Sequence, residues 1–193
     1  MTKENTRQRL IDAAYEEIYS HGYQGAALAD ILKRAGVHKG SMYHFFANKK
    51  EMALSAVHEK IEERLDTRYR AVLDGGAPYL PRFFAMLHDT SERDFRRGCP
   101  IANLVQEMSN LDEDFDRAMK AVYDRFREVF RGIYARAVAS GELAACDTGR
   151  LARFSLIVLE GAILSAKATG EPSDYLEAVD MLEEYLSRYR RSA

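Results

Sequence analysis

The chain has 193 residues, of which 47% are hydrophobic and 30% charged, and its formal net charge is −2. This composition is typical of a globular protein with a sizeable core, built as one domain or two small ones. Two cysteines cannot form a disulfide framework, and residues 2–9 are too polar for a secretory leader. The longest apolar stretch, 154–166, is short and is interrupted by Glu160, which excludes a membrane span. We therefore expect a cytoplasmic protein that does not associate with membranes.

The first quarter of the chain predicts a long helix followed by a pair of short helices. Residues 3–21 place apolar side chains on one helical face and end at Gly22. A short helix over 28–35 is followed by Gly36, a residue suited to the left-handed conformation that ends a helix. A second short helix begins at Lys39 or Gly40 and continues to about Phe45, whose ring we expect in the core. This pattern indicates a helix-turn-helix, the unit that places its second helix in the DNA major groove.

The rest of the chain predicts helices only. Asn48 is a suitable N-cap for a helix over 49–73, and Pro78 and Pro100 open helices that end near 88 and 110. A strong heptad-like pattern follows Asp112 and continues to about Gly141. Asp147 can cap a helix that ends near 169, and Asp174 with Glu177 has the spacing of a capping box for a last helix ending near 190. We expect an all-α fold of nine helices without strands.

The charge is distributed unevenly along the chain. Residues 1–50 contain eight lysines and arginines and five acidic residues, so this part carries a formal charge of +3. The remaining residues carry −5. The asymmetry is modest, but its sign is the one that phosphate binding requires.

The residues of this region resemble the TetR family of bacterial regulators. The matching residues are Gly22-Tyr23, Ile31, Ala35-Gly36-Val37, Lys39-Gly40-Ser41, Tyr43, His44-Phe45 and Lys49. The chain departs from the family at Ala26 and Ala27, where Thr or Ser is usual, and at His38. The resemblance implies a nine-helix TetR-like fold with a DNA-binding domain over 1–50 and a ligand-binding and dimerisation domain over 51–193. It also implies a repressor that a small-molecule or electrophile effector releases from its operator.

The candidate DNA contacts lie around the second short helix. Lys39 and Ser41 stand at its start, where side chains reach bases or nearby phosphates, and Gly40 allows close approach of the backbone. The resemblance implies that Tyr43 and His44 contact phosphate or thymine methyl groups and that Lys49 binds phosphate. Thr6 is a candidate phosphate contact from the first helix. The alternative for Tyr43 and His44 is that they pack inside the domain.

Two DNA-binding domains in a symmetric homodimer supply the affinity that one domain lacks. We therefore expect a pseudo-palindromic duplex DNA operator. The last two helices each carry an apolar stripe that could form a four-helix bundle across the dimer axis. The predicted interface residues are Phe154, Ile157, Val158, Gly161, Leu164, Leu182, Tyr185 and Leu186. The alternative is that these stripes pack only within the subunit.

The middle helices carry aromatic and Met residues, which sequence alone assigns to the core. The resemblance implies that some of them line an effector pocket, with candidates Phe84, His88, Cys99, Asn103, Gln106, Met119, Tyr123 and Phe126. Cys99 follows Arg96-Arg97-Gly98 and precedes a helix, and both features favour a thiolate. The resemblance adds Lys167 as the companion of Cys99 in an oxidant- or electrophile-sensing pair. The alternative for Cys99 is a packing role.

Other classes of function are disfavoured. The five histidines lack metal-ligand spacing, and the chain has neither a Gly-rich phosphate loop nor a nucleophile elbow. We therefore expect no enzymatic activity, no metal and no cofactor. The remaining alternative is a helical ligand-binding or scaffold protein that does not bind DNA.

Overall fold

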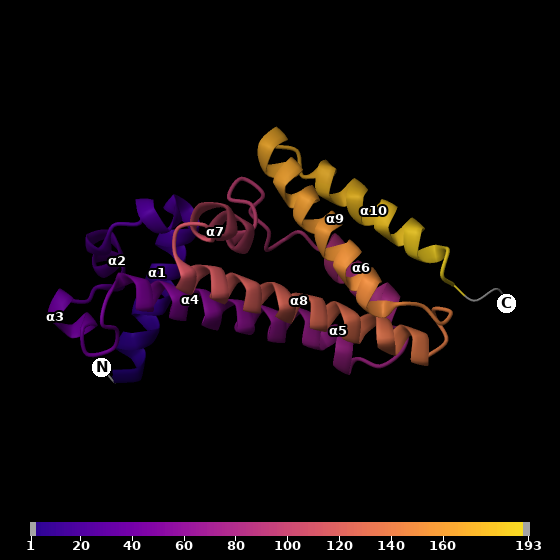
Figure 1. The fold of residues 1–193 in the computed structure, drawn as a ribbon, viewed down its shortest axis with the longest axis horizontal. Coiled ribbons are helices and arrows are strands. Elements are labelled where there is room, and N and C mark those ends of the chain that lie inside the picture. The colour runs from indigo at the N-terminus through magenta and orange to yellow at the C-terminus, as the bar shows by residue number, and fades with distance from the viewer. Residues whose placement is uncertain (1–2, 191–193) are drawn as a thin grey trace. The chain divides into compact units, whose positions relative to one another are not determined.

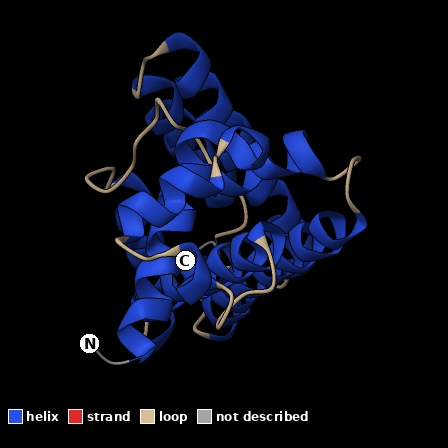
Figure 2. Ribbon diagram, turned by 90° about the vertical axis from the view of Figure 1, so that its left-hand side faces the viewer, coloured by secondary structure: helices blue, strands red, loops and turns tan. Residues whose placement is uncertain are grey.

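The computed structural model describes residues 3–190, and in that range it is helical without strands (Figures 1 and 2). Because α4, a π-helical segment and α5 follow one another without a break, the described residues form nine helices, as predicted. None of them is long and apolar enough to cross a membrane. In chain order the elements are α1 (Lys3–Gly25), α2 (Leu28–Ala35), α3 (Lys39–Met42), α4 (Lys49–Arg64), the π segment (Leu65–Tyr69), α5 (Arg70–Asp74), α6 (Tyr79–His88), α7 (Pro100–Met108), α8 (Glu113–Ala139), α9 (Thr148–Thr169) and α10 (Ser173–Ser187).

The chain forms two compact units that are interleaved in sequence. The first unit comprises Met1–Glu63 and Pro100–Val122, and the second comprises Arg64–Cys99 and Tyr123–Ala193. The first unit therefore contains the helix-turn-helix together with α7 and the beginning of α8. The assignment of separate functions to 1–50 and 51–193 stays a prediction.

In the first unit, the predicted apolar face of α1 is buried. Leu10, Ile11 and Ile18 are at most 4% exposed, and Ile31 of α2 is fully buried with them in the core. Gly22 interrupts α1 with φ 74° and ψ 169°, so the regular helix ends where the sequence predicted. Asn48 caps α4, because its Oδ1 accepts the Glu51 amide at 2.9 Å.

The second short helix is shorter than predicted. α3 ends at Met42, and the chain continues through turns instead of extending the helix to Phe45. This change moves the inward-facing position by one residue. Phe46 is buried (2% exposed), whereas Phe45 is only half-buried, so the prediction that Phe45 is the core aromatic is wrong.

In the second unit, an aromatic cluster holds α6 against α8. The Phe83 ring lies 5.3 Å from that of Phe130 and 5.9 Å from that of Tyr134, in edge-to-face arrangements. The buried Tyr134 hydroxyl lies 2.6 Å from that of Ser155 in α9, which satisfies both polar groups. Aromatic residues in helical register thus pack as core, as composition alone suggested.

The last two helices, α9 and α10, lie side by side (Figure 1). Asp147 caps α9 as predicted, accepting the Arg150 amide at 2.9 Å. The predicted capping box at α10 is wrong. Asp174 lies inside the first turn, and its carboxylate accepts hydrogen bonds from Ser165 (2.6 Å) and Thr169 (3.1 Å) of α9. Because these two hydroxyls occupy the Asp174 carboxylate, it connects α10 to α9 instead of capping α10.

Candidate nucleic-acid interface and effector region

The turn between α2 and α3 is stabilised by backbone geometry and by one side chain of α1. Gly36 adopts the left-handed conformation (φ 62°, ψ 41°), and the Val37 amide donates to the Leu32 carbonyl at 3.0 Å. The guanidinium of Arg9 donates to the Ala35 carbonyl and, at 3.0 Å, to the Gly36 carbonyl. A side chain at position 36 would collide with Arg9. The turn is therefore fixed from two directions.

The fixed turn leaves one side of α3 open to solvent. Met42 is fully buried, while Lys39, Gly40 and His44 are exposed and Tyr43 is 51% exposed. The alternative that Tyr43 and His44 pack inside the domain is therefore wrong. Ser41 is half-buried, and so is Thr6 in α1. The exposed side chains are of the types that contact phosphates and base edges.

The cations of this region differ in whether they have acidic partners. Lys33 and Lys39 are exposed and form no ion pair with any residue of the described range 3–190. Other basic side chains are already paired, namely Arg7 with Glu59, Arg34 with Glu17, and Lys50 with Asp112 and Asp114. The positive charge available to a polyanion thus lies on α2 and at the start of α3.

Lys49, a predicted phosphate contact, has protein partners. Its ammonium donates to the Tyr23 carbonyl at 2.5 Å and lies 4.4 Å from the centre of the Tyr23 ring. Burial lowers the pKa of Lys49, and the nearby Glu107 carboxylate opposes that effect. These contacts give Lys49 a structural role that sequence reasoning missed, and its contact with DNA stays a prediction.

Glu107 of α7 holds the segment that follows the break in α1. Its two carboxylate oxygens accept the amides of Tyr23 and Gln24, each at 2.8 Å. The Tyr23 ring also packs on Phe115 of α8, with centroids 4.6 Å apart. Sequence analysis missed this contact because the partners are 84 residues apart and no local pattern connects them.

The predicted effector residues are divided between the two units. Asn103, Gln106 and Met119 belong to the first unit, and Gln106 is exposed there while Met119 is buried. The second unit contains Phe84, His88, Cys99, Tyr123 and Phe126. His88 is engaged within that unit, because its ring nitrogens lie 2.8 Å from both the Phe84 carbonyl and the Asp180 carboxylate.

Cys99 lies in a partly buried polar environment. Its Sγ donates to Oε1 of Glu160 in α9 at 3.4 Å. Burial, followed by the nearby Glu160 and Cys99, raises the pKa of Tyr123. Lys167, the predicted companion of Cys99, runs its side chain over Gly98, where an added Cβ would meet its Cδ at 2.7 Å.

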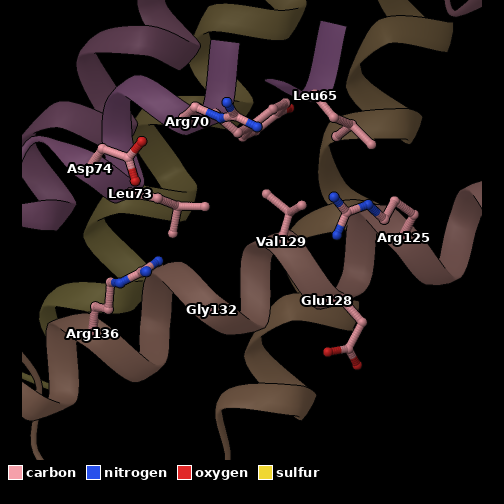
Figure 3. A pocket seen from close by; sticks show the side chains of 10 residues that line it. Leu65, Arg70, Leu73, Asp74, Arg125, Glu128, Val129, Gly132 and Arg136 are labelled. Carbon is pink, nitrogen blue, oxygen red and sulfur yellow. The ribbon is translucent and has the colours of Figure 1, made fainter. Parts of the chain in front are cut away.

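A surface pocket of about 340 Å³ lies between the π segment with α5 and α8 (Figure 3). Arg70, Arg125 and Arg136 stand at its edges, with Leu73 and Val129 between them (Figure 3). Asp74 and Glu128 offset part of this positive charge. None of the effector residues predicted from sequence lines this pocket.

The exposed face of α9 carries most of the predicted dimer residues. Phe154 is 39% exposed, Ile157 71% and Leu164 53%, and nothing lies within 4 Å of the position that a Cβ would take at Gly161. Val158 and Tyr185 are half-buried. Leu182 and Leu186 are at most 2% exposed, so the prediction that they form a dimer surface is wrong. Both leucines are covered within the subunit, where α10 packs on α9.

Comparison with known proteins gives a consistent result. A family model described as bacterial regulatory proteins of the tetR family matches residues 10–56, and one described as a tetracyclin repressor-like C-terminal domain matches residues 76–182. The chain is 38% identical over 175 residues to the transcriptional regulator AcuR of Cereibacter sphaeroides, covering 86% of this chain and 78% of that protein.

Two further relatives share much of the chain. The transcriptional repressor NemR of Escherichia coli is 29% identical over 129 residues, which cover 61% of each protein. The crystal structure of a regulatory protein TetR from Rhodobacter sphaeroides superposes with a TM-score of 0.77 at 32% identity, covering 94% of this chain and 97% of that one.

Proposed function

This chain belongs to the TetR family of bacterial regulatory proteins, and from that premise we propose that it represses transcription from a pseudo-palindromic operator as a homodimer. The family consists of DNA-binding regulators and not of enzymes, so the chain is a DNA-binding transcriptional regulator. Such a protein acts on the chromosome, and we therefore propose that it is cytoplasmic.

The observation that supports the proposed operator contact is the solvent-exposed start of α3. Lys39, Tyr43 and His44 are exposed above a turn that Gly36 and Arg9 hold in place. Lys39 has no acidic partner in the described range. We therefore assign Lys39, Gly40, Ser41, Tyr43 and His44 to contacts with bases and nearby phosphates. Thr6 and Lys49 are assigned to the flanking backbone.

The homodimer is proposed to form through the exposed face of α9. Large apolar side chains such as Ile157 are costly to leave in water, and Gly161 permits close approach of a second helix. Phe154 stacks on Tyr185 of α10, with centroids 4.8 Å apart, which extends the apolar face towards the last helix. A symmetric pairing of these faces gives a four-helix bundle.

Release from DNA is proposed to follow binding of a small-molecule effector at residues of the middle helices. The candidate pair Cys99 and Lys167 is retained as an oxidant- or electrophile-sensing alternative, because the Lys167 side chain lies against Gly98, next to Cys99. Replacement Cys99→Ser is expected to abolish DNA release by an alkylating agent. An unchanged electrophile response of that variant would remove the sensing hypothesis.

Selection from a random duplex pool, followed by anisotropy titration of the selected DNA in increasing salt, tests the function. With about four to six phosphates neutralised per dimer, the logarithm of affinity should fall with the logarithm of salt at a slope of about −4 to −5. A protein that enriches no sequence and shows no binding at low ionic strength would instead be the helical ligand-binding or scaffold protein.

A further inference from the structure

The second unit buries polar atoms that have no hydrogen-bond partner in the described part of the chain. Among them are the Tyr175 hydroxyl, Oε2 of Glu160, Nε of Arg93 and Nη1 of Arg68. Tyr175 is fully buried in α10. Buried polar groups in proteins are almost always paired, so several orphans in one region require an explanation such as a ligand or ordered water.

These side chains face one region. The guanidinium carbon of Arg93 lies 4.6 Å from the centre of the Tyr175 ring. Arg68 is held in place by hydrogen bonds from Nη2 to the carbonyls of Met86 (3.2 Å) and Asp89 (3.0 Å), which leave Nη1 without a partner. Glu160 lies close enough to Arg93 and Tyr175 for its charge to interact with both. One of its carboxylate oxygens accepts the Cys99 thiol and the other is unpaired.

The electrostatics of the cluster favour an anion. Arg68 and Arg93 form no ion pair with an acidic side chain within residues 3–190. Burial and then the charges of Arg93 and Arg64 lower the pKa of Arg68, which means that positive charge is uncompensated there. Burial raises the pKa of the Glu160 carboxyl. The two guanidinium groups and the Tyr175 hydroxyl are the hydrogen-bond donors that this cluster presents.

We propose that Arg68, Arg93, Tyr175 and Glu160 form the polar end of the effector site, and that it takes a small organic acid with one carboxylate. This inference rests on the proposed function and specifies the class of its ligand. A carboxylate can accept hydrogen bonds from a guanidinium and a phenol together. An ionised Glu160 repels a dianion such as phosphate more strongly than it repels a monocarboxylate. Phe95, whose ring lies 5.3 Å from that of Tyr175, supplies apolar surface for the remainder of the molecule.

Calorimetric titration of the full-length protein tests the proposal, with the sodium salts of acetate to octanoate, their primary amides and inorganic phosphate as probes. At least one carboxylate should bind, and its amide and phosphate should bind about 10-fold or more weakly. Tyr175→Phe and Arg93→Gln should each weaken carboxylate binding by about 10-fold or more. Equal affinity for acid and amide, tighter binding of phosphate, or no binding of any probe would overturn the proposal.

Tyr134→Phe is the matched control, because Tyr134 is also a buried tyrosine but has Ser155 as its partner. Without ligand, Tyr175→Phe should melt at or above the wild-type temperature, while Tyr134→Phe should melt lower. Ligand should raise the melting temperature of Tyr134→Phe more than that of Tyr175→Phe, since only Tyr175→Phe should lose affinity. Equal ligand affinity of wild type and Tyr175→Phe would show that the hydroxyl is satisfied by water and not by the acid.

The same preparation is titrated with the selected DNA in the absence of any acid, which separates two kinds of failure. DNA binding without carboxylate binding refutes the ligand class and leaves the proposed function standing. Carboxylate binding without DNA binding refutes the proposed function and leaves the site standing.

Discussion

Lys39 and Lys49 belong to the same sequence motif but have different environments. Lys39 is exposed and has no acidic partner in the described residues, whereas Lys49 donates to the Tyr23 carbonyl. Loss of Lys39 should therefore weaken DNA binding without changing stability, whereas loss of Lys49 should lower the stability of the fold in addition to any loss of DNA binding.

Replacement Lys39→Ala is expected to reduce DNA affinity by at least about 10-fold, because a dimer loses two contacts of roughly 1 kcal/mol or more each. Its free energy of unfolding should stay within about 0.5 kcal/mol of wild type. Lys49→Ala serves as the comparison and should lower that free energy by about 1 kcal/mol. Anisotropy titrations and urea denaturation measure both quantities. Wild-type DNA affinity of the Lys39 variant would contradict the assignment.

Gly22 combines two requirements that only glycine meets. Its φ of 74° is strained for other residues, and an added Cβ would lie 2.6 Å from Oε2 of Glu107. Gly22→Ala should therefore lower the free energy of unfolding by about 1–3 kcal/mol. Gly40→Ala is the control, because nothing lies within 4 Å of its Cβ position. Chemical denaturation of both variants should separate them, and equal stability would refute the role given to the Glu107 contact.

The sequence predicted the roles of residues correctly where those roles depend on neighbouring residues. It predicted them incorrectly, or not at all, where the roles depend on contacts that are distant in sequence. The left-handed Gly36 and the Asn48 cap follow from neighbouring residues, and both are confirmed. Phe45 was misplaced because one residue of early helix termination changes which aromatic faces inward. The cluster of unpaired buried polar groups could not be predicted, because residues 68, 93, 160 and 175 meet only in the folded second unit. In the sequence, the only indication of this cluster was the charged Glu160 within an otherwise apolar helix.

At the scale of elements, helix boundaries were predicted well because caps and glycines mark them. Asp147 and Asp174 show the limit, since both were predicted to cap apolar helices but only Asp147 does so, while Asp174 lies inside α10. Asp174 accepts a hydrogen bond from a hydroxyl group of α9, and no sequence pattern within α10 predicts such a partner. The buried faces of α10 were likewise ambiguous, because an apolar stripe fits a subunit core and a dimer surface equally.

His88 connects α6 to α10 through Asp180 and gives a pH-dependent contribution to stability. The hydrogen bond to Asp180 is the main cause that raises the pKa of His88 in the folded protein. A raised pKa means that the contribution is complete below the unfolded value of about 6.5 and is lost as pH rises through the folded value. Because Asp180 is 70% exposed, the contribution is well below about 1 kcal/mol.

Urea denaturation of wild type and His88→Gln measures this effect. The stability difference between them should be largest near about pH 5.5 and should vanish near about pH 8. His38→Gln, at an exposed position of the first unit, is the control substitution outside the contact between α6 and α10. A difference that grows with pH would contradict the sign of the interaction.

At the scale of the whole molecule, the proposed function requires two copies of the chain. Ile157 is 71% exposed at the centre of the α9 face. Ile157→Asp would bury a charge in the proposed interface, a cost of several kcal/mol, and should shift the protein to monomers in analytical ultracentrifugation. Leu111→Asp is the control, because Leu111 is similarly exposed (67%) but lies outside α9 and α10. A dimeric Ile157→Asp protein would place the interface elsewhere.

Hydroxyl-radical footprinting of the selected operator tests the central claim most directly, because it reports the number and spacing of DNA contacts together. Wild-type protein should protect two symmetric half-sites whose centres lie about 10 base pairs, or a multiple of that distance, apart. Lys39→Ala should lose both protected regions at the same protein concentration. Protection of a single half-site, or an unchanged footprint with Lys39→Ala, would contradict a dimer that reads DNA through the start of α3.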